Sequence, residues 1–298
     1  MKIKYRRYYI YYLAKTLFFL LALLPLRAGM ALAAALGRLV FRLLPGYAKT
    51  TVANLDAAFP GNGDRNRKIA ENVFRNVAMN GVEWVKLLFS RVSVIDSMVT
   101  EVSGREHLDS VLAGGRGALI ITFHFGNWEL AGLYLAHIGY NGSLVARKVY
   151  FYKYNKFLEK MRARYNAKVI YRDESPKKML GALHRGEVVG IVPDQDVDSV
   201  NGVFVDYFGR KAYTPVAPVK IAMAVGTGIV PVFVIRKKDN THRVVIEEPI
   251  YPVKGDDVDG NIRRYTEEWT SLLERYVREY PEQWVWMHKR WKTRPEEE

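Results

Sequence analysis

The sequence predicts an α/β fold in which a mostly parallel sheet is flanked by helices, preceded by an N-terminal membrane-attached helical segment. Three observations lead to this prediction. Strand-like and helical segments alternate from about residue 116, the N-terminal end is basic and then strongly apolar, and 49% of the residues are hydrophobic. The 298 residues suffice for one large α/β domain or two small ones, either with a real core.

The first 45 residues have the composition of a membrane-seeking segment. Basic residues open the chain, tyrosine-rich and aliphatic sequence follows, and the longest charge-free run is Thr16–Leu26. A single span over about residues 8–26 and two amphipathic helices that meet at Pro25 in the headgroup region are both compatible with this pattern. A cleaved signal peptide is less favoured, because the amphipathic pattern continues past AGMALAAA through Arg38 and Arg42.

Residues 47–115 read as a helical lead-in. Residues 47–60 predict a short helix closed by Pro60, and residues 65–89 repeat apolar side chains at helical spacing, which indicates one long helix or two.

From residue 116 the pattern alternates between strands and helices, which is typical of βαβ units and a parallel sheet. The predicted strands are 118–122, 143–147, 168–172, 188–193, 229–235 and 243–248. The predicted helices are 128–138, 154–165, 176–186, 217–227 and, at the end, 263–280. The simplest division is an anchor or pair of interfacial helices at 1–45 and one main domain at 46–298. That domain would comprise the lead-in (46–115), an α/β core (116–250) and a C-terminal helix and tail (251–298).

Charge and cysteine content narrow the possible partners and chemistries. Forty-five Lys and Arg against 31 Asp and Glu give a net charge of +14, which favours a polyanionic partner such as an anionic membrane or an acidic protein. Nucleic acid has little support, because no zinc-finger spacing, RNP-like run or heptad series accompanies the charge. The absence of cysteine excludes a thiol nucleophile, a disulfide and a Cys-ligated zinc site.

The stretch TFHFGNWEL (122–130) combines the residues of a base-containing site with a strand-to-helix turn. Polar groups at the carboxyl ends of parallel strands meet at one sheet edge, and His124 follows such a strand. We expect Glu129, in the first turn of the next helix, to accept a hydrogen bond from one ring nitrogen of His124 and leave the other as a base. A strand-end histidine and a helix-dipole carboxylate with structural roles only are the alternative.

No G-x-S-x-G elbow supplies a nucleophile, so a substrate hydroxyl activated by His124 would attack directly. Gly126 permits a tight turn, and amides near Asn127 and Trp128 are placed to stabilise negative charge. The histidines lack metal-ligand spacing, and neither a metal nor another cofactor is expected.

Four separated motifs resemble those of a known family. They are HFGNWE (124–129), PDQD (193–196), YFGRKAYTP (207–215) and PEQWVWMHKRWKTRP (281–295), and over nearly the whole chain the sequence resembles the lipid A biosynthesis (late) acyltransferases of the lysophospholipid acyltransferase-like superfamily. The resemblance implies a glycerol-phosphate acyltransferase-like fold. It also implies a fatty acyl thioester on acyl carrier protein as donor and a hydroxyl of a lipid A precursor as acceptor, at the cytoplasmic side of the inner membrane.

By this resemblance His124 is the general base and Glu129 its orienting partner. Arg147, Arg172 and Asp173 match strand-end residues of the family. Asp194, Gln195 and Asp196 follow the strand 188–193 and so are expected at the same sheet edge as His124. With Gly126 and Asn127 of the turn, these are the expected substrate-binding residues. Coenzyme A as donor, and a lysophospholipid, an aminolipid or a phosphoinositide mannoside as acceptor, stay open. So do a lipid hydrolase and a non-catalytic lipid-binding protein of the same fold.

Overall fold

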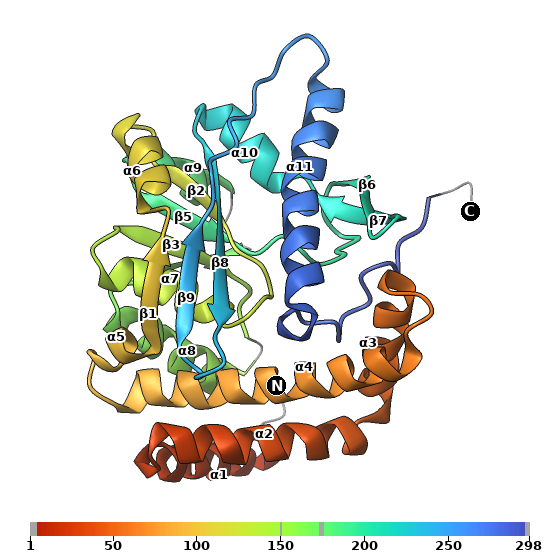
Figure 1. Ribbon diagram of the computed structural model, residues 1–298. Coiled ribbons are helices and arrows are strands. Elements are labelled where there is room, and N and C mark those ends of the chain that lie inside the picture. Colours follow the sequence, from red (N-terminus) through yellow and green to blue (C-terminus); the bar gives the residue numbers. More distant parts are fainter. Residues whose placement is uncertain (1–4, 150, 173–175, 296–298) are drawn as a thin grey trace.

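A computed structural model describes residues 5–149, 151–172 and 176–295, and its centre is a seven-stranded sheet (Figure 1). The strand order is β1-β9-β8-β2-β5-β3-β4. All neighbours pair in parallel except β8 and β9, which form an antiparallel hairpin. The strands are β1 (Val99–Ser103), β2 (Ala118–Ile121), β3 (Gly142–Ala146), β4 (Lys168–Tyr171), β5 (Val188–Ile191), β8 (Ile229–Arg236) and β9 (His242–Ile246). The predicted mostly parallel sheet is confirmed.

Helices cover both faces of this sheet, and the central strand β2 shows why. Its four residues are all buried, and their side chains alternate between two hydrophobic cores: Leu119 and Ile121 enter one, Ala118 and Ile120 the other. The first core is closed by α9 (Pro176–His184), α10 (Ala217–Val225) and α11 (Val258–Glu279). The second is closed by α6 (Arg105–Ala113), α7 (Trp128–His137) and α8 (Tyr152–Arg164), with the short α5 (Val94–Met98) beside them.

The N-terminal helices form a separate layer against the long helix α4 (Gly63–Phe89), seen at the bottom of Figure 1. α1 (Tyr5–Leu23) and α2 (Leu26–Leu43) break at Pro25, which is one of the two arrangements that the sequence allowed, and α3 (Pro45–Ala58) follows. α2 approaches α4 so closely that a Cβ on Gly37 would lie 2.7 Å from the backbone of Arg75. The sequence allowed one helix or two over residues 65–89, and the structure has a single helix there, α4.

Among the described residues, no single helix is long and apolar enough to cross a membrane. The bent pair α2 and α3, at 94° to each other, meets that requirement only when taken together, by length and composition.

The stretch 46–115, expected to be a helical lead-in, contains the strand β1, which pairs with β9 at the edge of the sheet. The antiparallel hairpin β6 (Gly202–Tyr207) and β7 (Arg210–Pro215), near the site, was also not predicted. Its turn residues Phe208 and Gly209 both have positive φ, 58° and 70°, as a two-residue hairpin turn requires. The hairpin packs beside α11 and the C-terminal segment, which we define as residues 281–295 and which starts with the 3-10 turn η2 (Pro281–Gln283).

Candidate functional site

The loop between β2 and α7 is fixed on both sides by close contacts with backbone atoms of other segments. Gly126 has φ +55°, and a Cβ there would lie 1.7 Å from the carbonyl oxygen of Val234, so the turn requires glycine. The C-terminal segment runs antiparallel beside the loop: Val285 donates its N–H to the His124 carbonyl at 2.9 Å, and Gly126 donates to the Gln283 carbonyl at 2.8 Å. The loop backbone is therefore fixed by a segment about 160 residues away in the chain.

His124 is paired with Asp194, which follows the neighbouring strand β5. Nδ1 of His124 lies 2.7 Å from Oδ1 of Asp194, and the His124 backbone N–H donates to Oδ2 at 2.9 Å. The Asp194 carboxylate is fully buried, whereas the histidine side chain is 22% exposed. Nε2 of His124 lies 3.4 Å from Nε2 of Gln195.

The expectation that Glu129 orients His124 is wrong for this geometry. Both oxygens of Glu129 are taken by Arg162 of α8, at 2.5 Å from Nε and 3.0 Å from Nη2. The physical reason is the register of α7. Its first turn presents Glu129 to the neighbouring helix, whereas the parallel pairing of β2 and β5 brings Asp194 to the end of the strand that carries His124.

The pair shifts both pKa values. Burial of Asp194 opposes ionisation, but the charge of His124 and hydrogen bonds from His124 and Trp284 hold its pKa well below the usual range. Burial of His124 disfavours its charged form, yet the Asp194 carboxylate outweighs this and raises the pKa of the imidazole. Because an ionised Asp194 only accepts, Nδ1 carries a proton and Nε2 of a neutral His124 carries the lone pair.

The other predicted residues lie around the same sheet edge. Arg147 and Arg172 are exposed and directly follow β3 and β4, whose last residues are paired in register. Both Asp196 oxygens accept from Thr293, one from its N–H and one from its hydroxyl, each at 2.8 Å, so Asp196 ties down the C-terminal segment. Asp173 lies outside the described residues. Roles of these residues toward a substrate stay predictions.

Asn127 caps α7, since its side-chain oxygen accepts the N–H of Leu130 at 3.3 Å. Among the described residues, none accepts a hydrogen bond from the backbone amides of Asn127 and Trp128. Two free amides thus lie at the positive end of a ten-residue helix, next to a histidine whose ring is 5.3 Å from that of Trp128.

Two contributors to the site were not predicted from the sequence. Arg162 is one of many basic residues on an amphipathic helix, and nothing in its local pattern distinguishes it. Trp284 donates its indole N–H to Asp194 at 2.8 Å, and the only signal was the tryptophan-rich motif in which it lies.

A partly exposed histidine whose tautomer is fixed by a buried carboxylate, beside unpaired amides, has the geometry that acyl-transfer enzymes use for a general base and an oxyanion hole. No group of three or more metal-ligating side chains comes together in the described parts of the chain.

The chain belongs to the bacterial lipid A biosynthesis acyltransferase family, whose match extends over residues 1–293. It is 30% identical to a lipid A biosynthesis lauroyltransferase of Escherichia coli K12, over 97% of this chain and 94% of the relative. It is 28% identical to the lipid A biosynthesis palmitoleoyltransferase of the same organism, over 81% and 78%. A phosphatidylinositol mannoside acyltransferase of Mycobacterium tuberculosis CDC 1551 is 25% identical over 64% and 59%. The protein is therefore an acyltransferase that acts on lipid acceptors.

Proposed function

We propose that this protein transfers a fatty acyl chain from an acyl carrier protein thioester to a hydroxyl of a lipid A precursor, with His124 as general base. The observation that carries the proposal is the 2.7 Å pairing of Nδ1 of His124 with buried Asp194, which leaves Nε2 as the acceptor of a proton. Asp194 takes the orienting role that the sequence had suggested for Glu129.

The reaction balances without a covalent enzyme intermediate. Nε2 of His124 removes the acceptor hydroxyl proton as the oxygen attacks the thioester carbonyl carbon. The resulting oxyanion meets the amides of Asn127 and Trp128. Its collapse breaks the C–S bond, and the imidazolium returns the proton to the leaving thiolate. The products are an ester and a free thiol.

Charge supports the choice of substrates. The net charge of +14 favours an acidic protein donor and a phosphorylated glycolipid acceptor. The exposed Arg147 and Arg172, at the ends of neighbouring strands, are suited to bind a phosphate or carboxylate.

The surface of the N-terminal layer supports attachment to a membrane. Exposed large apolar side chains concentrate there, on α1, on α2 and at their ends: Tyr9, Ile10, Tyr12, Leu13, Leu17, Phe18, Phe19, Leu20, Leu23, Leu24, Leu32, Leu36, Leu39, Val40, Leu43 and Leu44. A patch of this kind is expected to meet lipid. We propose that residues 1–45 attach the main domain, 46–298, to the cytoplasmic face of the inner membrane.

The test uses purified wild type, His124→Ala and a matched control, His184→Ala, which removes an exposed imidazole at the end of α9. Each is given a panel of acyl carrier protein thioesters and a tetra-acylated lipid A precursor, and products are read by mass spectrometry. We expect wild type and the control to add one acyl group, and His124→Ala to be slower by at least about a hundredfold.

Other outcomes separate the parts of the proposal. Thioester consumption by wild type with that acceptor unchanged would refute the acceptor, and a mannosylated phosphoinositide would be tried next because one relative acts on such a lipid. Full activity of His124→Ala would refute the base. If acyl coenzyme A replaced the carrier protein thioester without loss of rate, the donor assignment would be wrong.

A further inference from the structure

Three residues of α4 form hydrogen bonds with the loop that carries the proposed oxyanion donors. Asn80, Glu83 and Trp84 have the i, i+3, i+4 spacing of one helix face, and that face contacts residues 126 and 127 at the start of α7. Asn80 donates its side-chain N–H to the Gly126 carbonyl at 2.7 Å. The Asn127 side chain is held twice, by Glu83 Oε2 at 2.7 Å and by the Trp84 indole N–H at 2.9 Å.

The hydrogen bond from Asn80 to the Gly126 carbonyl sets the direction of the next amide in the chain. No described peptide is cis, and in a trans peptide the C=O and the following N–H point in opposite directions. By binding the carbonyl from the α4 side, Asn80 turns the Asn127 N–H to the opposite side, away from α4. That N–H is one of the two amides that no described residue accepts.

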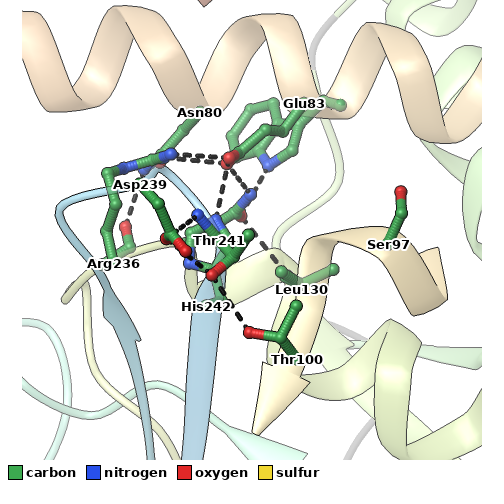
Figure 2. A network of polar contacts seen from close by, with 12 residues as sticks. Asn80, Glu83, Ser97, Thr100, Leu130, Arg236, Asp239, Thr241 and His242 are labelled. Carbon is green, nitrogen blue, oxygen red and sulfur yellow. Dashed lines mark hydrogen bonds and ion pairs between the residues drawn. The ribbon is translucent and has the colours of Figure 1, made fainter. Parts of the chain in front are cut away.

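Asn80 and Glu83 are themselves held by a buried ionic cluster that includes residues at the ends of two strands. Arg236, the last residue of β8, donates to Glu83 Oε1 at 2.6 Å, to Glu83 Oε2 at 2.8 Å and to Asn80 Oδ1 at 2.6 Å. His242, the first residue of β9, places Nε2 2.8 Å from Glu83 Oε1. Figure 2 shows Asn80 and Glu83 on α4 facing Arg236 and His242 across this cluster.

All members of this cluster are buried, so the desolvation of its charges offsets much of what the ion pairs contribute to stability. Glu83 is 1% exposed, and although burial opposes its ionisation, the charges of His242 and Arg236 lower its pKa to about 2. A buried ion pair is often no more stabilising than an apolar pair of the same volume, but its hydrogen bonds impose direction. Direction is what the Gly126–Asn127 peptide needs.

We propose that Asn80, Glu83 and Trp84 are positioning residues for acyl transfer, which with Arg236 aim the Asn127 amide at the developing oxyanion. This rests on the proposed function, and it predicts a loss in the chemical step without a change in the base.

The experiment compares Asn80→Ala and Asn80→Asp with Asn66→Ala in the full chain. Asn66 is a matched control because it is a fully buried asparagine of the same helix whose Nδ2 also donates to a backbone carbonyl, that of Phe59 at 2.9 Å. Asn80→Asp keeps an acceptor for Arg236 but loses the donor to Gly126. For each protein we would measure kcat and KM for transfer, the rate of thioester hydrolysis, the pH profile of kcat/KM, and Tm.

We expect both Asn80 variants to lose about 10- to 100-fold in kcat for transfer and in hydrolysis, since removing one oxyanion donor costs about 10² to 10³. Their KM values and the pH of the acid limb should stay unchanged. Asn66→Ala should lower Tm similarly while kcat stays within about twofold of wild type. Should Asn80→Ala fail to fold, Trp84→Phe replaces it, because it keeps the ring contact with Trp128 and loses only the donor to Asn127.

The possible outcomes distinguish a failure of this inference from a failure of the proposed function. If the Asn80 variants lose Tm but keep kcat, or if the acid limb moves with them, the residues do not act through the oxyanion and the inference is overturned while acyl transfer by wild type stands. A wild type that cleaves no thioester at all overturns the proposed function and this inference together.

Discussion

Trp284 and the backbone of His124 donate to the same oxygen of Asp194, at 2.8 and 2.9 Å. This leaves the other oxygen for Nδ1 of His124, so the carboxylate has one orientation available. The tryptophan belongs to the C-terminal segment, and the site is thus completed by residues far along the chain from the histidine that they serve.

Replacing Trp284 by Phe should lower kcat about tenfold, because Asp194 loses one donor worth roughly 1.5 to 3 kcal/mol and is then oriented by His124 alone. Steady-state kinetics test this. Trp286→Phe is the matched control, since Trp286 is equally buried and gives its N–H to the Pro281 carbonyl instead. Equal losses in the two variants would show that Trp284 acts by packing alone.

Asp194→Asn should change both the rate and its pH dependence. Wild-type kcat/KM should rise as pH increases through the raised pKa of His124, because the base must be neutral. Without the carboxylate, burial alone acts on the imidazole, so the acid limb of the residual activity should move to lower pH. The plateau should fall by about 10³ to 10⁴ as for other carboxylate-oriented histidines. An acid limb that stays in place would mean that another group titrates there.

The Glu129–Arg162 pair can be tested for a role beyond stability. Its side chains are 9% and 11% exposed, so Glu129→Gln or Arg162→Met alone should cost about 3 to 5 kcal/mol. We expect the double variant to recover much of that loss in Tm while its activity stays at least tenfold low. Thermal unfolding gives Tm, and a parallel assay gives the activity. Recovery of both Tm and activity in the double variant would make the pair purely structural.

His288 should make the protein acid-sensitive. Burial lowers its pKa to about 4 from 6.5, and neither ring nitrogen has a hydrogen-bond partner among the described residues. Between these pH values the unfolded chain binds a proton that the folded protein does not. The free energy of unfolding should therefore fall by up to roughly 3 kcal/mol as pH drops from 6.5 to 4. Urea titrations of His288→Phe should lack this component, and an unchanged pH dependence would contradict it.

Leu13 and Leu17 of α1 are 63% and 54% exposed, and replacing both by Glu should reduce binding to anionic phospholipid vesicles at least about tenfold, because burial of each side chain contributes about 1.5 to 3 kcal/mol. Co-sedimentation with vesicles measures it. Val258→Glu, at an exposed apolar position on α11, should bind as wild type. Undiminished binding by the double variant would place the lipid contact elsewhere.

The parts of the fold that follow from local periodicity were predictable from the sequence. Strand β2 and helix α7 were expected within about one residue of where they lie, and with them the position of His124 at the sheet edge. The partner of His124 was not, because spacing along the chain favoured Glu129, whereas strand pairing brought Asp194 closer. Tertiary contacts such as that of Arg162 leave no local pattern. The hairpin turn at Phe208 and Gly209 lacks the usual Asn-Gly or Asp-Gly signal, since a phenylalanine adopts positive φ there.

The pairing of residues 283–285 with the histidine loop has a consequence for biosynthesis. During translation the sheet, α7 and α4 all leave the ribosome before this stretch does, so until it is synthesised Asp194 lacks the Trp284 donor and the Gly126 amide lacks its acceptor. The site would then be completed only after residues 283–285 have been synthesised. A stop codon near position 280 would remove the Trp284 donor and the Gln283 acceptor and leave the histidine loop without these contacts.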